Sequence, residues 1–417
     1  MSPAFAIQQR VGLRNVDAAV LAAFSNFSQL YPGSSAWNRA QWCTAAGGLG
    51  LRSVEDHADA AFVASITSTL PLQIAIFPGV TSEEILSAAP CQAALASLQP
   101  KLPDPLFRKL ASGEGVPQKV LSKSLDTAAL EACLGSTSTP SHMKAHLQLV
   151  TLPGADAWLH APPSRDQRTQ MSSELFRIAL GRRLRLPFLD APACCSMCGA
   201  AMDVFMDHAM VCPCGGDRTL RHNAIRNVTY AACRESGINA ELEKAGLLPP
   251  RSTDEEVTPA HRTDQRGRRP ADIWVPRGFD GHGGAIDFAV TSGLRTDRIA
   301  AAATDPSSIV AAYEEHKRRY LDTERQCNDQ GFQFLPFVVE AHGGGLAIGA
   351  RRIISFIAKS AAARNGEEIE VESAGLSRSI SISIHRENAR AILRRQWPAV
   401  VPAPAVDPGV WLVPQCQ

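Results

Sequence analysis

The chain of 417 residues lacks any uninterrupted apolar run of about 18 residues, the length that a membrane-spanning helix requires. Its first residues, MSPAFAIQQRVGLRN, also lack the basic flank and apolar run of a secretory signal. We therefore expect an intracellular protein without a membrane partner. In that environment the 11 cysteines are not expected to form a disulfide framework, and a cluster among them indicates metal binding.

The sequence also has almost no net charge. Its formal value of +1 excludes a histone-like polycation and an acidic tail protein. Lysine is scarce, with 8 residues against 34 arginines, and 29 of these arginines follow residue 160. The planar guanidinium of arginine suits bidentate contacts with phosphates and base edges. A GC-rich genome would give the same bias, since Ala and Gly are abundant too, so composition alone leaves a nucleic-acid partner open.

No internal repeat is present, and the length fits two or three domains. Apolar residues recur at helical spacing through the first 150 residues, with Gly and Pro turns between them, which predicts a helical region. Beyond residue 214 the pattern is mixed. It predicts strands at 240–243, 271–275, 285–291 and 332–340 and helices at 220–236, 307–323 and 346–363, before a Pro-rich tail at 398–417 that we expect to be loosely ordered.

The strongest local signal is a cysteine cluster. A Cys-x2-Cys pair, Cys195 and Cys198, is followed by His208 and Cys212 at the spacing of a zinc knuckle. Zn2+ takes four soft or borderline ligands at tetrahedral angles, and a Cys-x2-Cys turn supplies two of them from one tight loop. These four residues are the predicted ligands of a structural Zn2+ ion, with Cys194 and Cys214 as possible substitutes. The alternative is a set of ordinary reduced cysteines in a loop.

The segment after the cluster puts Arg218, Arg221 and His222 at the start of a predicted helix. A helix N-terminus with arginines nearby favours phosphate binding. We therefore predict that these three side chains contact nucleic acid. A capping and surface cluster is the competing interpretation.

Two acidic residues fall in or beside apolar strands. Asp272 lies at the start of the predicted strand at 271–275, and Asp287 lies inside the next one, after a Gly-rich turn. A buried carboxylate needs a partner, and two on adjacent strands suit Mg2+, which activates water and neutralises charge in phosphodiester hydrolysis. Pairing with nearby arginines is the structural alternative.

The predicted helix at 307–323 adds basic groups. Lys317 and Tyr320 are three residues apart and are expected on one face, while Arg318 and Arg319 extend the basic surface toward nucleic acid. A lysine beside a metal-bound phosphate positions water or stabilises developing charge. Glu340, at the end of the predicted strand 332–340, is a third carboxylate expected to face the same site. The alternative interpretation is that this helix has no catalytic role and is an ordinary charged helix exposed to solvent.

In this order, the motifs resemble the C-terminal region of non-LTR retrotransposon polyproteins that carry a restriction-like endonuclease of PD-(D/E)xK type. The motifs that carry the resemblance are the cysteine and histidine cluster, Arg-His-Asn at 221–223, Pro-Ala-Asp at 270–272, Asp-Phe at 287–288, Lys-x2-Tyr at 317–320 and VEAHGG at 339–344. It covers about residues 150–365. Residues 36–65 look like the helical region that follows the polymerase in such elements, and no paired Asp-Asp motif of a polymerase palm occurs.

The resemblance implies roles for individual residues. Asp272 matches the first metal-binding aspartate and Asp287 the second acidic residue. Ala289 stands where a restriction-type nuclease has its lysine, whereas the family tends to place that lysine on the following helix with a nearby tyrosine, which Lys317 and Tyr320 match. The implied activity is Mg2+-dependent nicking of target DNA to prime reverse transcription, in the nucleus, by the part of an element downstream of its polymerase. DNA is the implied partner, element RNA is left open as a second one, and no small-molecule cofactor is implied.

We therefore expect a mixed α/β protein in four parts: a helical region at 1–150, a helix plus zinc knuckle at 151–216, a restriction-endonuclease-like domain at 217–365 with a small mixed sheet flanked by helices, and an extension at 366–417. The competing hypothesis is a non-catalytic relic that still binds nucleic acid. A decayed product with neither activity is the third.

Overall fold

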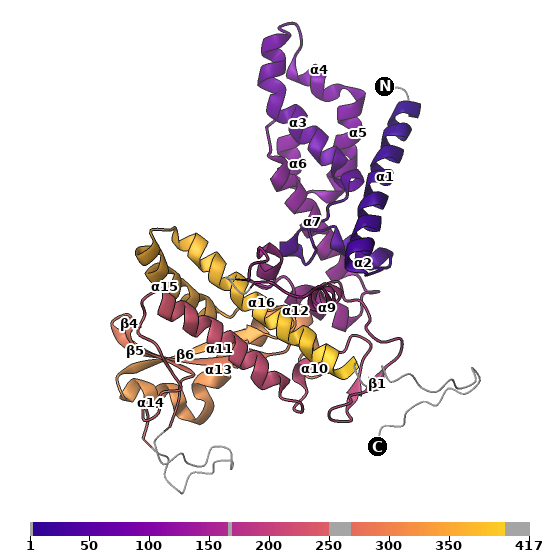
Figure 1. Ribbon diagram of the computed structural model, residues 1–417. Coiled ribbons are helices and arrows are strands. Elements are labelled where there is room, and N and C mark those ends of the chain that lie inside the picture. The colour runs from indigo at the N-terminus through magenta and orange to yellow at the C-terminus, as the bar shows by residue number, and fades with distance from the viewer. Residues whose placement is uncertain (1–2, 166–168, 250–267, 397–417) are drawn as a thin grey trace, which may run out of the picture. The chain divides into compact units, whose positions relative to one another are not determined.

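The computed structural model describes residues 3–165, 169–249 and 268–396 (Figure 1). The predicted Pro-rich tail at 398–417 lies outside the described residues. The chain divides into two compact units between Pro140 and Ser141. This division precedes the expected boundary at residue 150, because the helix after Pro140 contributes Ala145 and Leu149 to a core with Leu294 and Ala302 of the second unit.

The first unit is helical, as the spacing of its apolar residues predicts. Its helices are α1 (Pro3–Ser28), α2 (Ser34–Ala40), α3 (Val54–Ile76), α4 (Ser82–Ser87), α5 (Ala89–Leu98), α6 (Asp104–Ala111) and α7 (Gln118–Gly135), with short 3-10 turns η1 (Thr44–Ala46) and η2 (Gln99–Lys101). Val63, Leu98, Leu110 and Leu121, from four different helices, meet in the core. Helix α3 is long and apolar enough to cross a membrane by length and composition alone, and it also buries five side chains in this unit.

The second unit combines helices with two small sheets. Its elements are α8 (Ser141–Leu149), η3 (Ala157–His160), α9 (Ser173–Arg183), β1 (Ala193–Cys194), β2 (Ala201–Met202), α10 (His208–Val211), α11 (Asp217–Glu235), β3 (Glu241–Leu242), β4 (Ile273–Phe279), β5 (His282–Thr291), α12 (Ile299–Thr304), α13 (Pro306–Arg319), η5 (Tyr320–Asp322), α14 (Thr323–Asp329), β6 (Phe332–Glu340), α15 (Ile348–Asn365) and α16 (Ile369–Gln396). The four strands expected after the cysteine cluster are all present. The expected class, a mixed α/β protein with a small mixed sheet flanked by helices, is confirmed.

The larger sheet has the strand order β3-β4-β5-β6. Strands β4 and β5 form an antiparallel hairpin, whereas β5 and β6 run parallel because helices α12, α13 and α14 cross over between them. The close approach of the hairpin strands explains a glycine before the apolar run of β5. A Cβ on Gly283 would lie 2.4 Å from the Trp274 ring.

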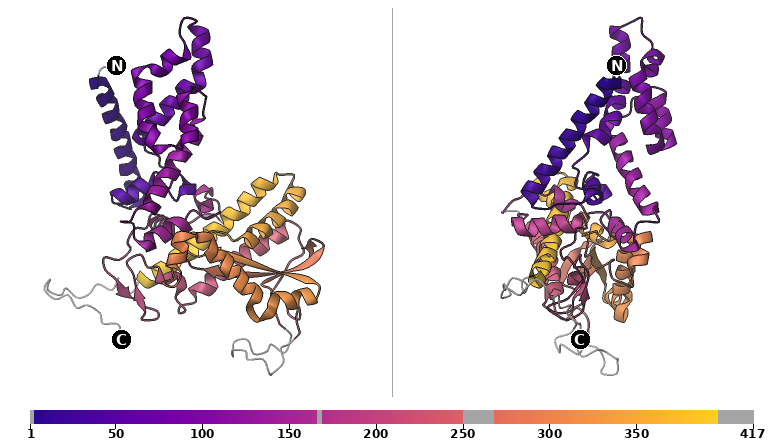
Figure 2. Two further views of the ribbon diagram at one scale, coloured as in Figure 1. Left: turned by 180° about the vertical axis from the view of Figure 1, so that it is seen from behind. Right: turned by 90° about the vertical axis from the view of Figure 1, so that its right-hand side faces the viewer.

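Helices cover both faces of this sheet (Figures 1 and 2). Strand residues alternate between the two faces, as the pleat requires. One set, including Ile286 and Phe337, packs against α11, α15 and α16. The opposite set packs against α13 and α14, through Val310 and Cys327. The unit is therefore layered helix, sheet, helix, and side chains from both helical layers reach the ends of β4 and β5.

Helix α16 lies in the expected extension at 366–417, but it is part of the second unit. It packs along α11, α15 and α9, and its residues Ile380 and Ile384 are buried in the same core as the sheet. Ser and Ile alternate in this stretch, so its apolar residues do not recur at the spacing that indicates a helix.

Candidate metal centre and carboxylate site

The predicted cysteine and histidine ligands come from a short hairpin and a one-turn helix. Strands β1 and β2 flank the turn that carries Cys195 and Cys198, and Gly199 closes this turn with φ of +73°. Helix α10 begins at His208, and Cys212 follows it one turn later. Both parts of the motif therefore present their side chains toward one point.

The four ligand atoms converge as the spacing predicts. They all lie within 4.8 Å of one another, with 3.9 Å between the Sγ atoms of Cys195 and Cys212 and 3.1 Å between Cys198 Sγ and His208 Nε2. Cys194 and Cys214, which the sequence left open as substitutes, are outside this group. The cluster is suited to hold a metal ion.

The surroundings of Cys195 and His208 favour the protonation states that metal ligands need. Burial alone would raise the pKa of the Cys195 thiol, but the backbone N–H groups of Met197 and Cys198 and the guanidinium of Arg395 lower it to about 7. Burial and the charge of Arg395 lower the pKa of His208. A thiolate and a neutral imidazole are the forms that coordinate metals.

The segment that carries the Cys3His cluster is part of the core of the second unit. Met202, Met206 and Met210 pack with Ile178 of α9 and Ile392 of α16. Met206 has no exposed surface. The segment is therefore not a separate module on a linker, and its conformation is coupled to the helices that support the larger sheet.

The two predicted aspartates lie close together where the pairing of β4 with β5 ends. The antiparallel register ends with Ile273 opposite Ile286; Asp272 is the bend residue directly before Ile273, and Asp287 directly follows Ile286. The backbone N–H of Asp272 donates to Ile286 O at 2.9 Å. The backbone N–H of Phe288 also donates to Asp272 Oδ2 at 2.7 Å, which holds this carboxylate at the end of β4.

Lys317 reaches the second aspartate from helix α13. Its Nζ lies 2.6 Å from Asp287 Oδ2, and the Asp287 side chain is 20 % exposed. Burial raises the pKa of Asp287 to about 6, with the charge of Asp272 acting in the same direction and Lys317 opposing it. Burial would lower the pKa of Lys317, but the contact with Asp287 raises it. The lysine is therefore a cation at the carboxylate pair.

His222 reaches the first aspartate from helix α11. Its Nε2 lies 3.1 Å from Asp272 Oδ2, and its Nδ1 lies 3.2 Å from Asn223 Oδ1. Burial would lower the pKa of His222, but the hydrogen bond and charge of Asp272 outweigh it and raise this pKa. The prediction from the sequence is a nucleic-acid contact for His222, with no link to Asp272. Its position in the Arg-His-Asn motif was the only signal.

Tyr320 does not continue the helical face of Lys317. Helix α13 ends at Arg319, and the next residues turn with positive φ at Leu321 and Asp322. The Tyr320 ring packs against His316, with centroids 5.6 Å apart, and is 41 % exposed. The predicted pairing of Lys317 with Tyr320 rested on a helix longer than the one that forms.

Glu340 lies away from the aspartate pair. It is opposite Thr291 in the parallel register, whereas Asp287 is opposite Pro336. Four residues along a strand correspond to about 13 Å. The structure therefore does not bring Glu340 to the carboxylates of Asp272 and Asp287.

The Glu340 carboxylate is fully buried and has its own partners. It accepts hydrogen bonds from the backbone N–H groups of Gly293, His342 and Gly343, at 3.1, 2.7 and 2.6 Å. Burial raises its pKa to about 7, although these donors and the nearby Arg182 oppose the shift. These contacts indicate that Glu340 holds the loops that follow β5 and β6.

The two arginines of α11 have opposite environments. Arg218 is exposed on the helix surface. Arg221 is 3 % exposed and donates to Asn388 Oδ1 at 2.8 Å and to the backbone oxygen of Met210 at 2.7 Å. Arg221 therefore joins α11 to α16 and α10, and its guanidinium does not face solvent, where the predicted phosphate contact would require it.

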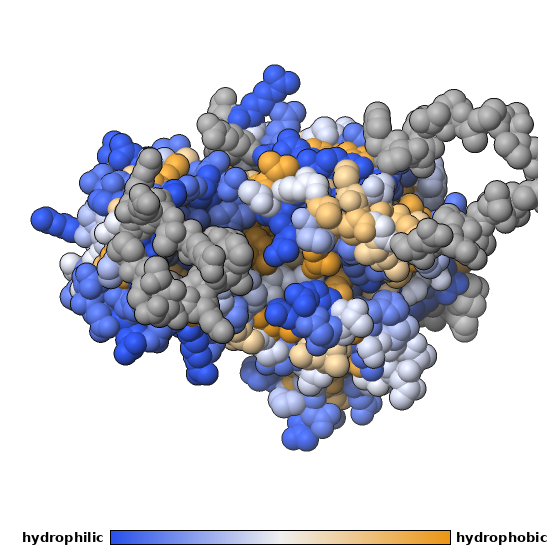
Figure 3. Space-filling model, turned by 90° about the horizontal axis from the view of Figure 1, so that it is seen from below, coloured by the Kyte–Doolittle hydropathy of each residue, from blue (hydrophilic) through white to orange (hydrophobic). Residues whose placement is uncertain are grey.

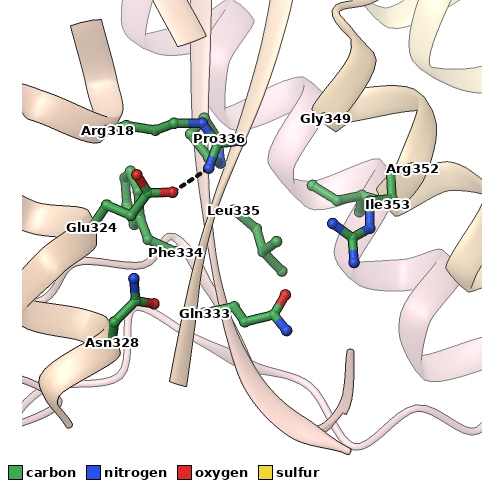
Figure 4. A pocket seen from close by; sticks show the side chains of 10 residues that line it. All are labelled: Arg318, Glu324, Asn328, Gln333, Phe334, Leu335, Pro336, Gly349, Arg352 and Ile353. Carbon is green, nitrogen blue, oxygen red and sulfur yellow. Dashed lines mark hydrogen bonds and ion pairs between the residues drawn. The ribbon is translucent and has the colours of Figure 1, made fainter. Parts of the chain in front are cut away.

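The arginines of α13 also differ. Arg319 is exposed and pairs with Glu315 one turn earlier. Arg318 pairs with Glu324 and lines a cavity of about 210 Å3 between α13, α14, β6 and α15, with Gln333 and Arg352 on its other walls (Figure 4). Arg318 is partly committed to its acidic neighbour. On the face shown in Figure 3, apolar side chains lie in several small groups among hydrophilic ones.

No protein-family model matches the chain, and no curated protein matches it. The site is therefore defined by its geometry: a Cys3His cluster, and a carboxylate pair with Lys317 on one aspartate and His222 on the other.

Proposed function

We propose that the second unit is a Mg2+-dependent DNA endonuclease, the part of a non-LTR retroelement that nicks target DNA in the nucleus to prime reverse transcription. The observation that supports it best is that Asp272 and Asp287 both lie next to the Ile273–Ile286 pair at the end of the β4–β5 register, with Lys317 on the second carboxylate. Two acidic side chains and a lysine at the end of a small mixed sheet match the residue types that metal-assisted phosphodiester hydrolysis uses.

The free atoms of the pair fit this role. Asp272 Oδ2 is occupied by Phe288 N–H and His222, and Asp287 Oδ2 by Lys317. Within the described residues, neither Oδ1 atom has a hydrogen-bond donor. Carboxylate oxygens are the ligands that Mg2+ prefers, and the ion supplies a polarised phosphate and a more acidic water. Lys317 holds a positive charge beside the scissile phosphate, where negative charge develops.

We propose Zn2+ as the ion of the Cys3His cluster. A tetrahedral ion with Zn–S bonds of about 2.3 Å separates two sulfurs by about 3.8 Å. The Sγ atoms of Cys195 and Cys212 are 3.9 Å apart. Four protein ligands leave no open position, so this ion is structural.

DNA binding is assigned to exposed arginines. Arg218 on α11 is near His222 in sequence, and Arg319 on α13 is near Lys317, so both lie on the helices that supply the groups at the carboxylate pair. Exposed guanidiniums contact phosphates without reading sequence. Arg318 contributes only when its pairing with Glu324 is given up.

A non-catalytic relic that binds nucleic acid is the second candidate. One observation favours it: each aspartate already has a protein cation, His222 or Lys317, so the pair is satisfied without a metal ion. This arrangement is also what a structural ion-pair network looks like.

The deciding experiment measures nicking of supercoiled plasmid with Mg2+ by the full chain and by Asp272→Asn. Asp280→Asn is the matched control, because Asp280 lies in the same hairpin at its exposed turn. We expect loss of nicking in Asp272→Asn and full activity in Asp280→Asn. Equal nicking by wild type and Asp272→Asn would exclude this active site. Salt-dependent DNA binding without nicking in Mg2+ or Mn2+ would establish the relic.

A further inference from the structure

His222 is held from three sides. Its Nε2 lies 3.1 Å from Asp272 Oδ2, and its Nδ1 lies 3.2 Å from Asn223 Oδ1. Its ring meets the buried ring of Phe288 edge-on, with centroids 6.4 Å apart and an interplanar angle of 83°. The side chain is 28 % exposed. Both ring nitrogens are thus engaged within the protein.

These contacts define which oxygen of Asp272 is available. Oδ2 accepts from His222 and also from the backbone N–H of Phe288 at 2.7 Å. Two donors on one oxygen fix the plane of a carboxylate, because the group cannot rotate without losing both bonds. Within the described residues, Oδ1 has no hydrogen-bond donor.

We propose that His222 is a positioning residue that orients the Asp272 carboxylate so that Oδ1 is presented to a divalent cation. This inference rests on the proposed function and adds a helix α11 residue to its site. It replaces the predicted phosphate contact of His222, since neither ring nitrogen is free to meet a phosphate.

The arrangement has a counterpart on the other aspartate. Lys317 of α13 occupies Asp287 Oδ2 from the helical layer on one face of the sheet, while α11 belongs to the layer on the other face. Each layer therefore supplies one cationic side chain that takes one oxygen of one carboxylate. The two remaining oxygens belong to residues that both adjoin the Ile273–Ile286 pair of the hairpin. Hydrogen-bonded partners of metal ligands of this kind typically change metal affinity by about 10–100-fold when removed.

The test compares His222→Phe with His222→Gln. Phenylalanine keeps a ring against Phe288 but cannot donate, whereas the glutamine amide nitrogen reaches about as far as Nε2 and can donate. Mn2+ binding to the full chain, loaded with zinc and free of DNA, is followed by electron paramagnetic resonance. We expect affinity to fall about 10–100-fold in His222→Phe and to stay within a few-fold of wild type in His222→Gln. The Mg2+ concentration that half-saturates nicking should shift in parallel.

Several results would overturn the proposal. Wild-type Mn2+ affinity in a folded His222→Phe would do so, and so would equal losses in the Phe and Gln variants. If His222→Phe fails to fold, as judged by thermal unfolding, an impaired His222→Gln also counts against the role. A reduced salt dependence of DNA binding in EDTA for either variant would show that His222 contacts phosphate after all.

Asp272→Asn separates this inference from the proposed function. If Asp272→Asn leaves Mn2+ binding and nicking intact, the proposed function fails. If Asp272→Asn abolishes both and His222→Phe changes neither, only the role of His222 fails.

Discussion

The Nζ atom of Lys317 lies 2.6 Å from Oδ2 of Asp287, although the two residues belong to different elements, helix α13 and strand β5. Helix α13 forms part of the crossover that makes β5 and β6 parallel. The crossover that makes β5 and β6 parallel therefore also brings Lys317 to Asp287. Ala289 of β5, the position where a restriction-type nuclease has its lysine, packs against Val310 of the same helix.

Replacing Lys317 tests the part in hydrolysis that the proposed function assigns to it. We expect Lys317→Met to lower the single-turnover nicking rate by at least about 100-fold, because a preorganised charge beside the phosphate is lost. Lys317→Arg should retain part of the rate. Lys359→Met is the matched control, since Lys359 is an exposed lysine of helix α15. If Lys317→Met nicked DNA at the same rate as Lys359→Met, Lys317 would have no role in the active site.

Removing a metal ligand tests the Cys3His cluster. Cys212→Ser should release bound zinc and unfold the second unit at a lower temperature, because Met202, Met206 and Met210 of this segment are part of its core. A loss of about 5 kcal/mol corresponds to roughly 10–20 °C in a unit of this size. Cys214→Ser is the control, because Cys214 is exposed and outside the cluster. Calorimetry and a zinc assay measure both effects; equal midpoints for the two variants would contradict the cluster.

The strands and the Cys3His cluster could be predicted because their signals are local. An apolar run bounded by Gly or Pro indicates a strand, and a Cys-x2-Cys turn brings its thiols together by itself. The contact between His222 and Asp272 joins residues 50 positions apart and depends on how α11 lies over the sheet. Sequence spacing contains no information on that angle.

Helix phase explains the remaining differences. Arg218, Arg221 and His222 are close in sequence, yet one is exposed, one buried and one at the sheet. Consecutive helical residues point about 100° apart, so a polar helix start does not reveal which side faces inward. Tyr320 was placed on the face of Lys317 by assuming a helix that instead ends at Arg319.

The buried carboxylate of Glu340 predicts a pH-dependent stability. Its pKa is about 7 in the folded protein and near the ordinary 4.5 when unfolded, so folding favours the protonated form. Its contribution is fully present below pH 4.5 and is lost as the pH rises through 7. Between these values the free energy of unfolding should fall by up to about 3 kcal/mol. Glu340→Gln, which mimics the protonated form, should flatten this dependence in urea unfolding.

The same variant tests whether Glu340 belongs to the proposed active site. Because Glu340 lies about 13 Å along the sheet from the level of Asp287, Glu340→Gln should nick DNA at the wild-type rate at a pH where both proteins are folded. A loss of nicking rate as large as that of Asp272→Asn would mean that Glu340 belongs to the catalytic group. An unchanged pH profile of stability would show that its carboxylate is already ionised when buried.

The two arginines of helix α11 form a matched pair for the last prediction. Arg218→Ala should weaken DNA binding and reduce the slope of log affinity against log salt by about one, without changing stability, because Arg218 is exposed. Arg221→Ala should cost about 2–4 kcal/mol of unfolding free energy, because Asn388 Oδ1 and Met210 O lose their buried donor. Fluorescence anisotropy over a salt series and urea unfolding measure the two effects. If Arg221→Ala kept full stability and changed only the salt slope, the buried position of its guanidinium, and with it the packing of α11 on α16, would be wrong.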